Sequence, residues 1–135
     1  MLDMAKIDKI ELEITSDCNA ACPGCARTQN IDLLKIQSFT FADLERIFPD
    51  KSYIDKKKFK FCGVLGDPIV HPEFLEMVTY LAHNGGMVQI STNGAYQTPE
   101  FWKKLGECSR DTKNVSVSFA IDGHAQTNHI YRVNT

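Results

Sequence analysis

Residues 7–25 read IDKIELEITSDCNAACPGC, and this segment decides the fold. Its first part, residues 7–15, alternates apolar and polar residues in the manner of a half-buried β-strand. Three cysteines, Cys18, Cys22 and Cys25, then fall within eight residues of a loop that also contains proline and glycine. The segment therefore predicts a β-strand that ends in a cysteine-rich loop able to wrap a compact inorganic core.

The rest of the chain alternates short apolar runs with longer segments of helical period. β-Strands are expected at residues 7–15, 59–65, 87–91 and 115–121, and helices at residues 40–48, 71–82 and 98–107. Thr40 and Asp43 can cap the first of these helices, and Asn84-Gly85-Gly86 can end the second. This βαβαβαβ order predicts an α/β fold with a parallel sheet of about four strands, joined by right-handed crossovers. No internal repeat or linker divides the chain, so residues 1–135 are expected to form a single domain.

Glycine and polar residues follow the predicted strands. Cys18 comes after the first strand, Gly66-Asp67 after the second, residues 91–94 (Ser-Thr-Asn-Gly) after the third, and Asp122-Gly123 after the fourth. Since the carboxyl ends of parallel strands meet at one edge of a sheet, these groups are expected to lie together. Gly-Asp-Pro, Asn-Gly and Asp-Gly are also favourable turn sequences, so turn formation alone is the alternative explanation for each of them.

Composition limits the classes of function. The 135 residues are 43% hydrophobic and 24% charged, which is typical of one soluble globular domain. A net charge of -2 gives no general attraction to nucleic acids or anionic membranes. The sequence has no apolar stretch long enough to span a bilayer, and residues 1–4 lack the charged and apolar regions of a signal peptide. We therefore expect a cytoplasmic protein with no membrane partner and no indication of a nucleic-acid partner.

The cysteine pattern points to metal or redox chemistry rather than to disulfides. The chain has five cysteines, an odd number that cannot all pair, and three of them are spaced Cys-x3-Cys-x2-Cys. Structural zinc sites normally use four protein ligands, whereas an iron–sulfur cubane held by three cysteines keeps one iron open. Three interpretations remain at this point: an iron–sulfur cluster, a zinc site completed by a distant histidine or cysteine, or three incidental thiols. Cys62 and Cys108, outside the motif, are expected to be small buried hydrophobic residues.

Four motifs, in order along nearly the whole chain, resemble those of the radical S-adenosylmethionine (SAM) superfamily. The first is the cysteine triplet directly after the first strand. The second is residues 61–68 (FCGVLGDP) followed by His71-Pro72, which resemble that family's Gly-Gly-Glu-Pro motif. The third is residues 90–94 (ISTNG), which resemble its third-strand ending. The fourth is residues 120–123 (AIDG) with His129 and Arg132 downstream, which are similar to its Ser-Ile-Asp-Gly segment. The resemblance implies a partial TIM barrel of six βα units, of which this chain would form the N-terminal part.

The resemblance also implies a reaction and a site. Cys18, Cys22 and Cys25 would hold a [4Fe–4S] cluster whose open iron chelates the amino and carboxylate groups of SAM. One electron from a donor such as a flavodoxin or ferredoxin would cleave SAM to methionine and a 5'-deoxyadenosyl radical. The implied SAM contacts are the backbone at Gly66 and the side chains of Asp67 (amino group), Ser91 and Asn93 (polar contacts), Asp122 (ribose hydroxyls) and Arg132 (carboxylate).

The chain departs from the family pattern in its residues and its length. Gly24 stands before the third cysteine, where an aromatic residue beside the adenine is common, Asp67 replaces Glu, and Ala120 replaces Ser. The chain also ends soon after its fourth predicted strand, so we expect an incomplete domain, or one completed by self-association or by a partner chain. The substrate stays open. A non-catalytic zinc-binding structural or interaction module is the alternative function, and a partial barrel that binds neither metal nor SAM is a third.

Overall fold

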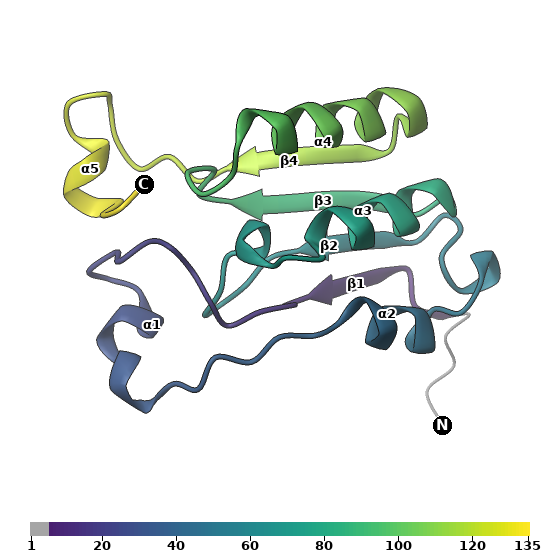
Figure 1. The fold of residues 1–135 in the computed structure, drawn as a ribbon, viewed down its shortest axis with the longest axis horizontal. Coiled ribbons are helices and arrows are strands. Elements are labelled where there is room, and N and C mark those ends of the chain that lie inside the picture. The colour runs from purple at the N-terminus through teal and green to yellow at the C-terminus, as the bar shows by residue number, and fades with distance from the viewer. Residues whose placement is uncertain (1–5) are drawn as a thin grey trace.

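The protein is built on one four-stranded parallel sheet (Figure 1). A computed structural model describes residues 6–135, and residues 1–4, on which the expectation about a signal peptide rests, lie outside the described part. The strands are β1 (Lys9–Leu12), β2 (Lys58–Phe61), β3 (Met87–Thr92) and β4 (Val115–Phe119), and they lie side by side in that order. Each neighbouring pair of these strands is parallel, so the predicted α/β fold is confirmed.

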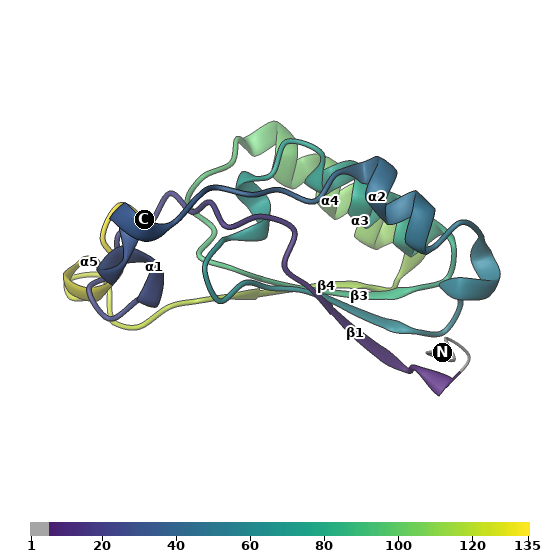
Figure 2. The same cartoon turned by 90° about the horizontal axis from the view of Figure 1, so that it is seen from below.

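Helices cover one face of this sheet. α2 (Phe41–Ile47), α3 (Phe74–His83) and α4 (Pro99–Thr112) lie over it, and the opposite face carries no helix in the part of the chain that the structure describes (Figure 2). Two short helices, α1 (Ala26–Gln29) and α5 (Asn128–Tyr131), lie near the carboxyl ends of the strands (Figure 1). Short 3₁₀ turns occupy Ile31–Leu33, Lys51–Tyr53 and Pro68–Val70.

The hydrophobic core lies between the sheet and the three longer helices. Phe59 and Phe61 of β2 are fully buried, and their rings meet those of Phe48 and Phe74 edge-on, with centroid distances of 5.2 and 5.3 Å. Because side chains alternate between the two faces of a strand, the lysines on either side of Phe59 lie on the other face. Burial of this apolar face fixes which side of the sheet the helices cover and leaves the other side open and polar.

The predicted strands and helices appear in the predicted order, with the short helices α1 and α5 in addition. β1, β2 and β4 are shorter than predicted, whereas β3 extends one residue further, to Thr92. β1 and β2 span only part of the predicted strands at residues 7–15 and 59–65. The chain leaves the sheet after Phe61, and the backbone N–H of Leu65 donates to the carboxylate of Glu13 (2.7 Å) instead of to a neighbouring strand. The residues between the end of β2 and the next helix therefore form a loop, and this loop becomes part of the candidate site.

The predicted N-terminal cap of α2 is present. The hydroxyl of Thr40 accepts from the N–H of Asp43 (3.1 Å), and the Asp43 carboxylate accepts from the N–H of Thr40 (3.0 Å), which forms a capping box at α2. At α4, the hydroxyl of Thr98 accepts from the N–H of Phe101. α4 extends past the predicted end to Thr112, and the next residue, Lys113, ends it with a left-handed φ of 59°. Within residues 6–135, no helix combines the length and apolar character needed to cross a membrane.

Candidate functional site

A cavity of about 350 Å³ lies at the carboxyl ends of the strands. The cysteine loop, the loop after β2, the end of β3 and the C-terminal segment all contribute to its walls. The predicted site residues that line it are Cys18, Cys22, Cys25, Gly66, Asp67, Ser91, Asn93 and Arg132. Asp122 is not among the lining residues. The structure therefore brings the predicted strand-end residues together at one edge of the sheet, with one exception.

The three motif cysteines differ in exposure. Cys22 is buried, and Cys18 and Cys25 are half-buried. The loop turns back on itself between the second and third cysteines, where the N–H of Cys25 donates to the carbonyl of Cys22 (3.0 Å). Among residues 6–135, no three His, Cys, Asp or Glu side chains converge closely enough to hold one metal ion. The cysteines of a cubane cluster bind separate iron atoms, so they need not converge in this way.

N–H groups point at two of the three sulfur atoms. The Sγ of Cys18 accepts from the backbone N–H of Ala20 (3.4 Å) and from Nδ2 of Asn93 (3.7 Å). The Sγ of Cys22 accepts from Nη1 of Arg132 (3.9 Å). Burial raises the pKa of the Cys18 thiol, whereas the hydrogen bond from Ala20 acts to lower that pKa. Hydrogen bonds of this kind stabilise negative charge on sulfur, which a metal-bound thiolate carries.

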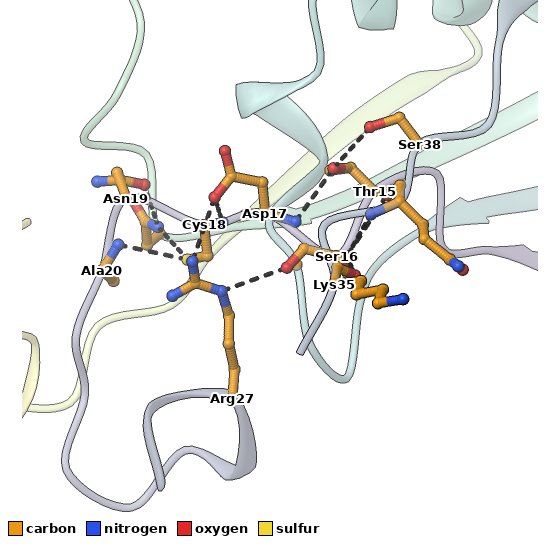
Figure 3. A network of polar contacts seen from close by, with 12 residues as sticks. Thr15, Ser16, Asp17, Cys18, Asn19, Ala20, Arg27, Lys35 and Ser38 are labelled. Carbon is orange, nitrogen blue, oxygen red and sulfur yellow. Dashed lines mark hydrogen bonds and ion pairs between the residues drawn. The ribbon is translucent and has the colours of Figure 1, made fainter. Parts of the chain in front are cut away.

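Arg27, in α1, ties the cysteine loop back to the segment that follows β1, at Ser16 and Asp17 (Figure 3). Its Nη2 lies 3.2 Å from the Asp17 carboxylate, and its Nε donates to the carbonyl of Ser16 at 3.2 Å. The same Asp17 oxygen accepts from the N–H of Cys18 (2.8 Å). The Arg27 side chain is 12% exposed, so solvent screens its charge only weakly. No sequence motif marked this pair, because it depends on how the loop folds back.

Asp67 joins the ends of three chain segments. Its carboxylate accepts hydrogen bonds from the N–H of Ile69 (3.2 Å), the hydroxyl of Thr92 (2.7 Å) and the N–H of Asn93 (2.7 Å). Its own N–H donates to the carbonyl of Asp17 (2.8 Å), and the residue is 6% exposed. The carboxylate is thus already bonded within the protein, and its contact with the SAM amino group stays a prediction.

We expect Asp67→Asn to lower the free energy of unfolding by about 2 kcal/mol. Asparagine keeps the shape of the side chain but replaces one acceptor oxygen with an N–H donor, so a donor then faces a donor in a buried site. Urea unfolding of the two proteins measures the difference. Asp50→Asn is the matched control, because Asp50 is an exposed cap to the N–H of Ser52, a position where Asn serves as well as Asp. Equal stability of the two variants would contradict the role assigned to Asp67.

Gly66 is required by a close approach of two loops. A Cβ at this position would overlap the carbonyl oxygen of Thr15 and would lie 2.9 Å from that of Asp17. Gly66 does not have a left-handed φ, whereas Gly94 has a φ of +77°. A turn therefore explains the glycine at Gly94, and backbone packing explains Gly66. The predicted approach of the Gly66 backbone to SAM stays a prediction.

The C-terminal segment, residues 127–135, lies against the cysteine loop. The carbonyl of Val133 accepts from the N–H of Ala21 (2.9 Å), and the carbonyl of Asn134 accepts from Nδ2 of Asn19 (3.1 Å). These bonds join positions more than a hundred residues apart in the chain. The segment therefore contributes one wall of the cavity.

Two residues of this segment, Tyr131 and Arg132, bear on the predicted site. Arg132 lines the cavity and forms an ion pair with Asp122. Asp122, the predicted residue that does not line the cavity, is therefore connected to it through Arg132. The ring of Tyr131 lies beside Gly24, where a Cβ would come within 2.9 Å of the tyrosine hydroxyl. An aromatic side chain thus stands next to the third cysteine even though the residue before that cysteine is glycine. It comes from α5, so no local motif could reveal it.

Cys62 differs from its expected environment. It is half-buried and lines the cavity, whereas we expected it in the core. A signal was present in the sequence: Cys62 directly follows Phe61, and neighbouring residues of a strand face opposite sides. Burial raises the pKa of the Cys62 thiol. Cys108 is buried in α4, as expected.

Two curated proteins have related sequences, although no family model matches the chain. The tungsten-containing aldehyde ferredoxin oxidoreductase cofactor-modifying protein of Pyrococcus furiosus is 34% identical over 100 residues, which cover 74% of this chain and 28% of that protein. The AdoMet-dependent heme synthase of Methanosarcina barkeri is 27% identical over 123 residues, which cover 91% of this chain and 34% of that protein. The chain thus spans about a third of the length of the curated relatives it matches.

A solved structure shares the fold. The crystal structure of BtrN in complex with AdoMet and 2-DOIA superposes with a TM-score of 0.60 and 16% sequence identity, covering 82% of this chain and 56% of that chain. At this identity the likeness concerns the fold, a parallel sheet with alternating helices that resembles part of a partial barrel. AdoMet is another name for SAM. The sequence relatives and the structural neighbour together point to the radical SAM superfamily. This is the superfamily whose motifs the four motifs of this chain resemble.

Proposed function

We propose that this chain acts as a radical SAM enzyme, or as part of one, with a [4Fe–4S] cluster on Cys18, Cys22 and Cys25. One observation carries the proposal: the three thiols line the same cavity as residues from each of the other three motifs, namely Gly66, Asp67, Ser91, Asn93, Ala120 and Arg132. The names of the relatives add support, since two of the three similar proteins are described with AdoMet. The role of the whole protein belongs to the proposal, because the chain spans only part of each relative.

The residues present fit such a cluster. Cysteine thiolates are the usual ligands of iron–sulfur clusters, and three of them leave one iron open for another molecule. The cavity of about 350 Å³ has the size of a small-molecule site. A cluster bound there would supply the chemistry of one-electron transfer to SAM: with an electron from a flavodoxin- or ferredoxin-type donor, SAM would be cleaved to methionine and a 5'-deoxyadenosyl radical.

The protein's own residues position the reactants. Asp67 links the loop after β2 to the end of β3 through Thr92 and the N–H of Asn93. The Asn93 amide in turn donates to Asn19 (2.9 Å) and toward Cys18, so the third motif is connected to the first. This network supports a fixed placement of the cysteine loop relative to the strand ends, which a radical reaction needs because the reactive carbon must meet one chosen hydrogen atom.

Completion of the barrel is also part of the proposal. Within the described residues, β4 pairs with β3 and has no strand on its other side. An unpaired strand edge is a natural place for another strand to add. A further segment, a second copy or a partner chain that completes the barrel would pair there.

The test is anaerobic reconstitution with iron and sulfide, followed by EPR spectroscopy of the reduced protein with and without SAM. We expect the signal of a reduced [4Fe–4S] cluster, and a change in that signal when SAM is added, because SAM then binds the open iron. Stoichiometric zinc without a cluster would support the zinc-binding module instead. If the protein binds neither iron nor zinc, both functions are refuted, and a partial barrel that binds neither metal nor SAM remains.

A further inference from the structure

Arg132 places a guanidinium group beside one cysteine of the proposed cluster. Its Nη1 lies 3.9 Å from the Sγ of Cys22, and its Nε is paired with the carboxylate of Asp122. The Arg132 side chain is 22% exposed. Although burial acts to lower the pKa of Arg132, the hydrogen bond and charge of Asp122 raise it overall, so the guanidinium stays charged.

The backbone on both sides of Arg132 is fixed. Arg132 follows the last residue of α5, and its N–H donates to the carbonyl of Asn128 (2.8 Å), the first residue of that helix. The next residue, Val133, accepts from the N–H of Ala21 in the cysteine loop (2.9 Å). The guanidinium carbon also lies 5.7 Å from the centre of the Tyr131 ring. The position of the charge is therefore set by the same contacts that hold the C-terminal segment on the cysteine loop.

A fixed positive charge at this position favours one redox state. Reduction adds one negative charge to a cluster, and a cation beside a sulfur ligand stabilises the reduced state more than the oxidised state. Hydrogen bonds to the sulfur atoms act in the same direction. Solvent screens a largely buried charge less than an exposed one, so the effect of Arg132 is expected to exceed that of arginines on the surface.

We propose that Arg132 is a positioning residue that raises the reduction potential of the cluster bound by the cysteine loop. The inference rests on the proposed function, because it requires a cluster on Cys22. It goes beyond the implied contact of Arg132 with the SAM carboxylate, because the effect needs no SAM. It also explains why the ion pair with Asp122 matters: Asp122 holds the guanidinium in place from outside the cavity.

The test is a redox titration of the reconstituted protein without SAM, followed by EPR spectroscopy. Arg132→Gln is expected to give a lower midpoint potential than the unchanged protein, since it removes the charge but keeps a polar side chain. Arg132→Lys keeps a charge with a shorter reach, so its potential is expected to fall in the same direction by less. Arg46→Gln is the matched control: it removes the same formal charge from an exposed arginine of α2, paired with Asp43, and is expected to leave the potential unchanged.

The outcomes separate the two proposals. Equal potentials for Arg132→Gln and the unchanged protein overturn this inference and leave the proposed function intact. An unchanged protein that binds no cluster overturns the proposed function and, with it, this inference. If Arg132→Gln fails to retain iron but Arg132→Lys retains it, the potential of Arg132→Lys decides between the outcomes. An unaltered potential in Arg132→Lys then overturns the inference.

Discussion

Cys22→Ala is expected to abolish cluster binding, with loss of the bound iron and sulfide and of the EPR signal of the reduced protein. Cys22 is the buried thiol of the three and lies between the other two in the loop. Alanine removes one of only three protein ligands, and the remaining two thiolates leave two irons of a cubane without a protein ligand. Iron and sulfide per chain after anaerobic reconstitution measure the loss directly.

Two other cysteines supply the controls. Cys108→Ala removes a buried thiol of α4 far from the motif in sequence, so iron binding is expected to be unaffected. Cys62→Ala is the sharper control, because Cys62 lines the cavity and is the cysteine that a four-ligand zinc site would use. Cluster retention in Cys62→Ala favours three-cysteine ligation. If the unchanged protein binds zinc and Cys62→Ala does not, the zinc-binding module is favoured. Full iron binding by Cys22→Ala would contradict the proposed site.

Gly66→Ala is expected to lower the free energy of unfolding by about 3 kcal/mol, at the upper end of the usual cost of overpacking. The added Cβ would overlap the carbonyl oxygen of Thr15, so the loop after β2 must move away from the segment that follows β1. That movement also strains the hydrogen bond from the N–H of Asp67 to the carbonyl of Asp17. Urea unfolding measures the change in stability, and iron content after reconstitution reports whether the site still forms.

Gly106→Ala is the matched control for this substitution. Gly106 lies inside α4, and a Cβ there would meet no heavy atom within 4 Å. Alanine is the better helix former, so this variant is expected to gain about 0.5–1 kcal/mol. The same chemical change is thus expected to have opposite signs at the two positions. A destabilisation of similar size at both would mean that the contact with Thr15 is not the cause.

Much of the fold followed from local patterns. The strands and helices appear in the predicted order because hydrophobic periodicity reflects which face of each element is buried, and this is a property of a few neighbouring residues. The capping box of Thr40 and Asp43 was predictable for the same reason. The bounds of the elements were less predictable. β2 ends at Phe61, and Leu65 in the loop that follows donates its N–H to Glu13, fifty-two residues earlier in the sequence.

The candidate site was predictable in its members and less so in their arrangement. Parallel strands bring their carboxyl ends together, and all predicted residues except Asp122 line one cavity. The partners of Asp67 and the place of Cys62 did not follow from the motifs. A motif records which residues occur in order, whereas these contacts depend on the distance between loops that only the folded chain defines.

The sequence by itself determined the α/β order, the cysteine triplet and the gathering of glycine and polar residues at the strand ends, because each is written in residues close together in the chain. Only the tertiary structure decided that Gly66 serves the approach of two backbones, that Tyr131 stands beside Gly24, and that Arg132 lies against Cys22. These three contacts join residues separated by about fifty to more than a hundred positions. They form only when burial of the core has fixed the sheet and brought the distant loops to its carboxyl edge.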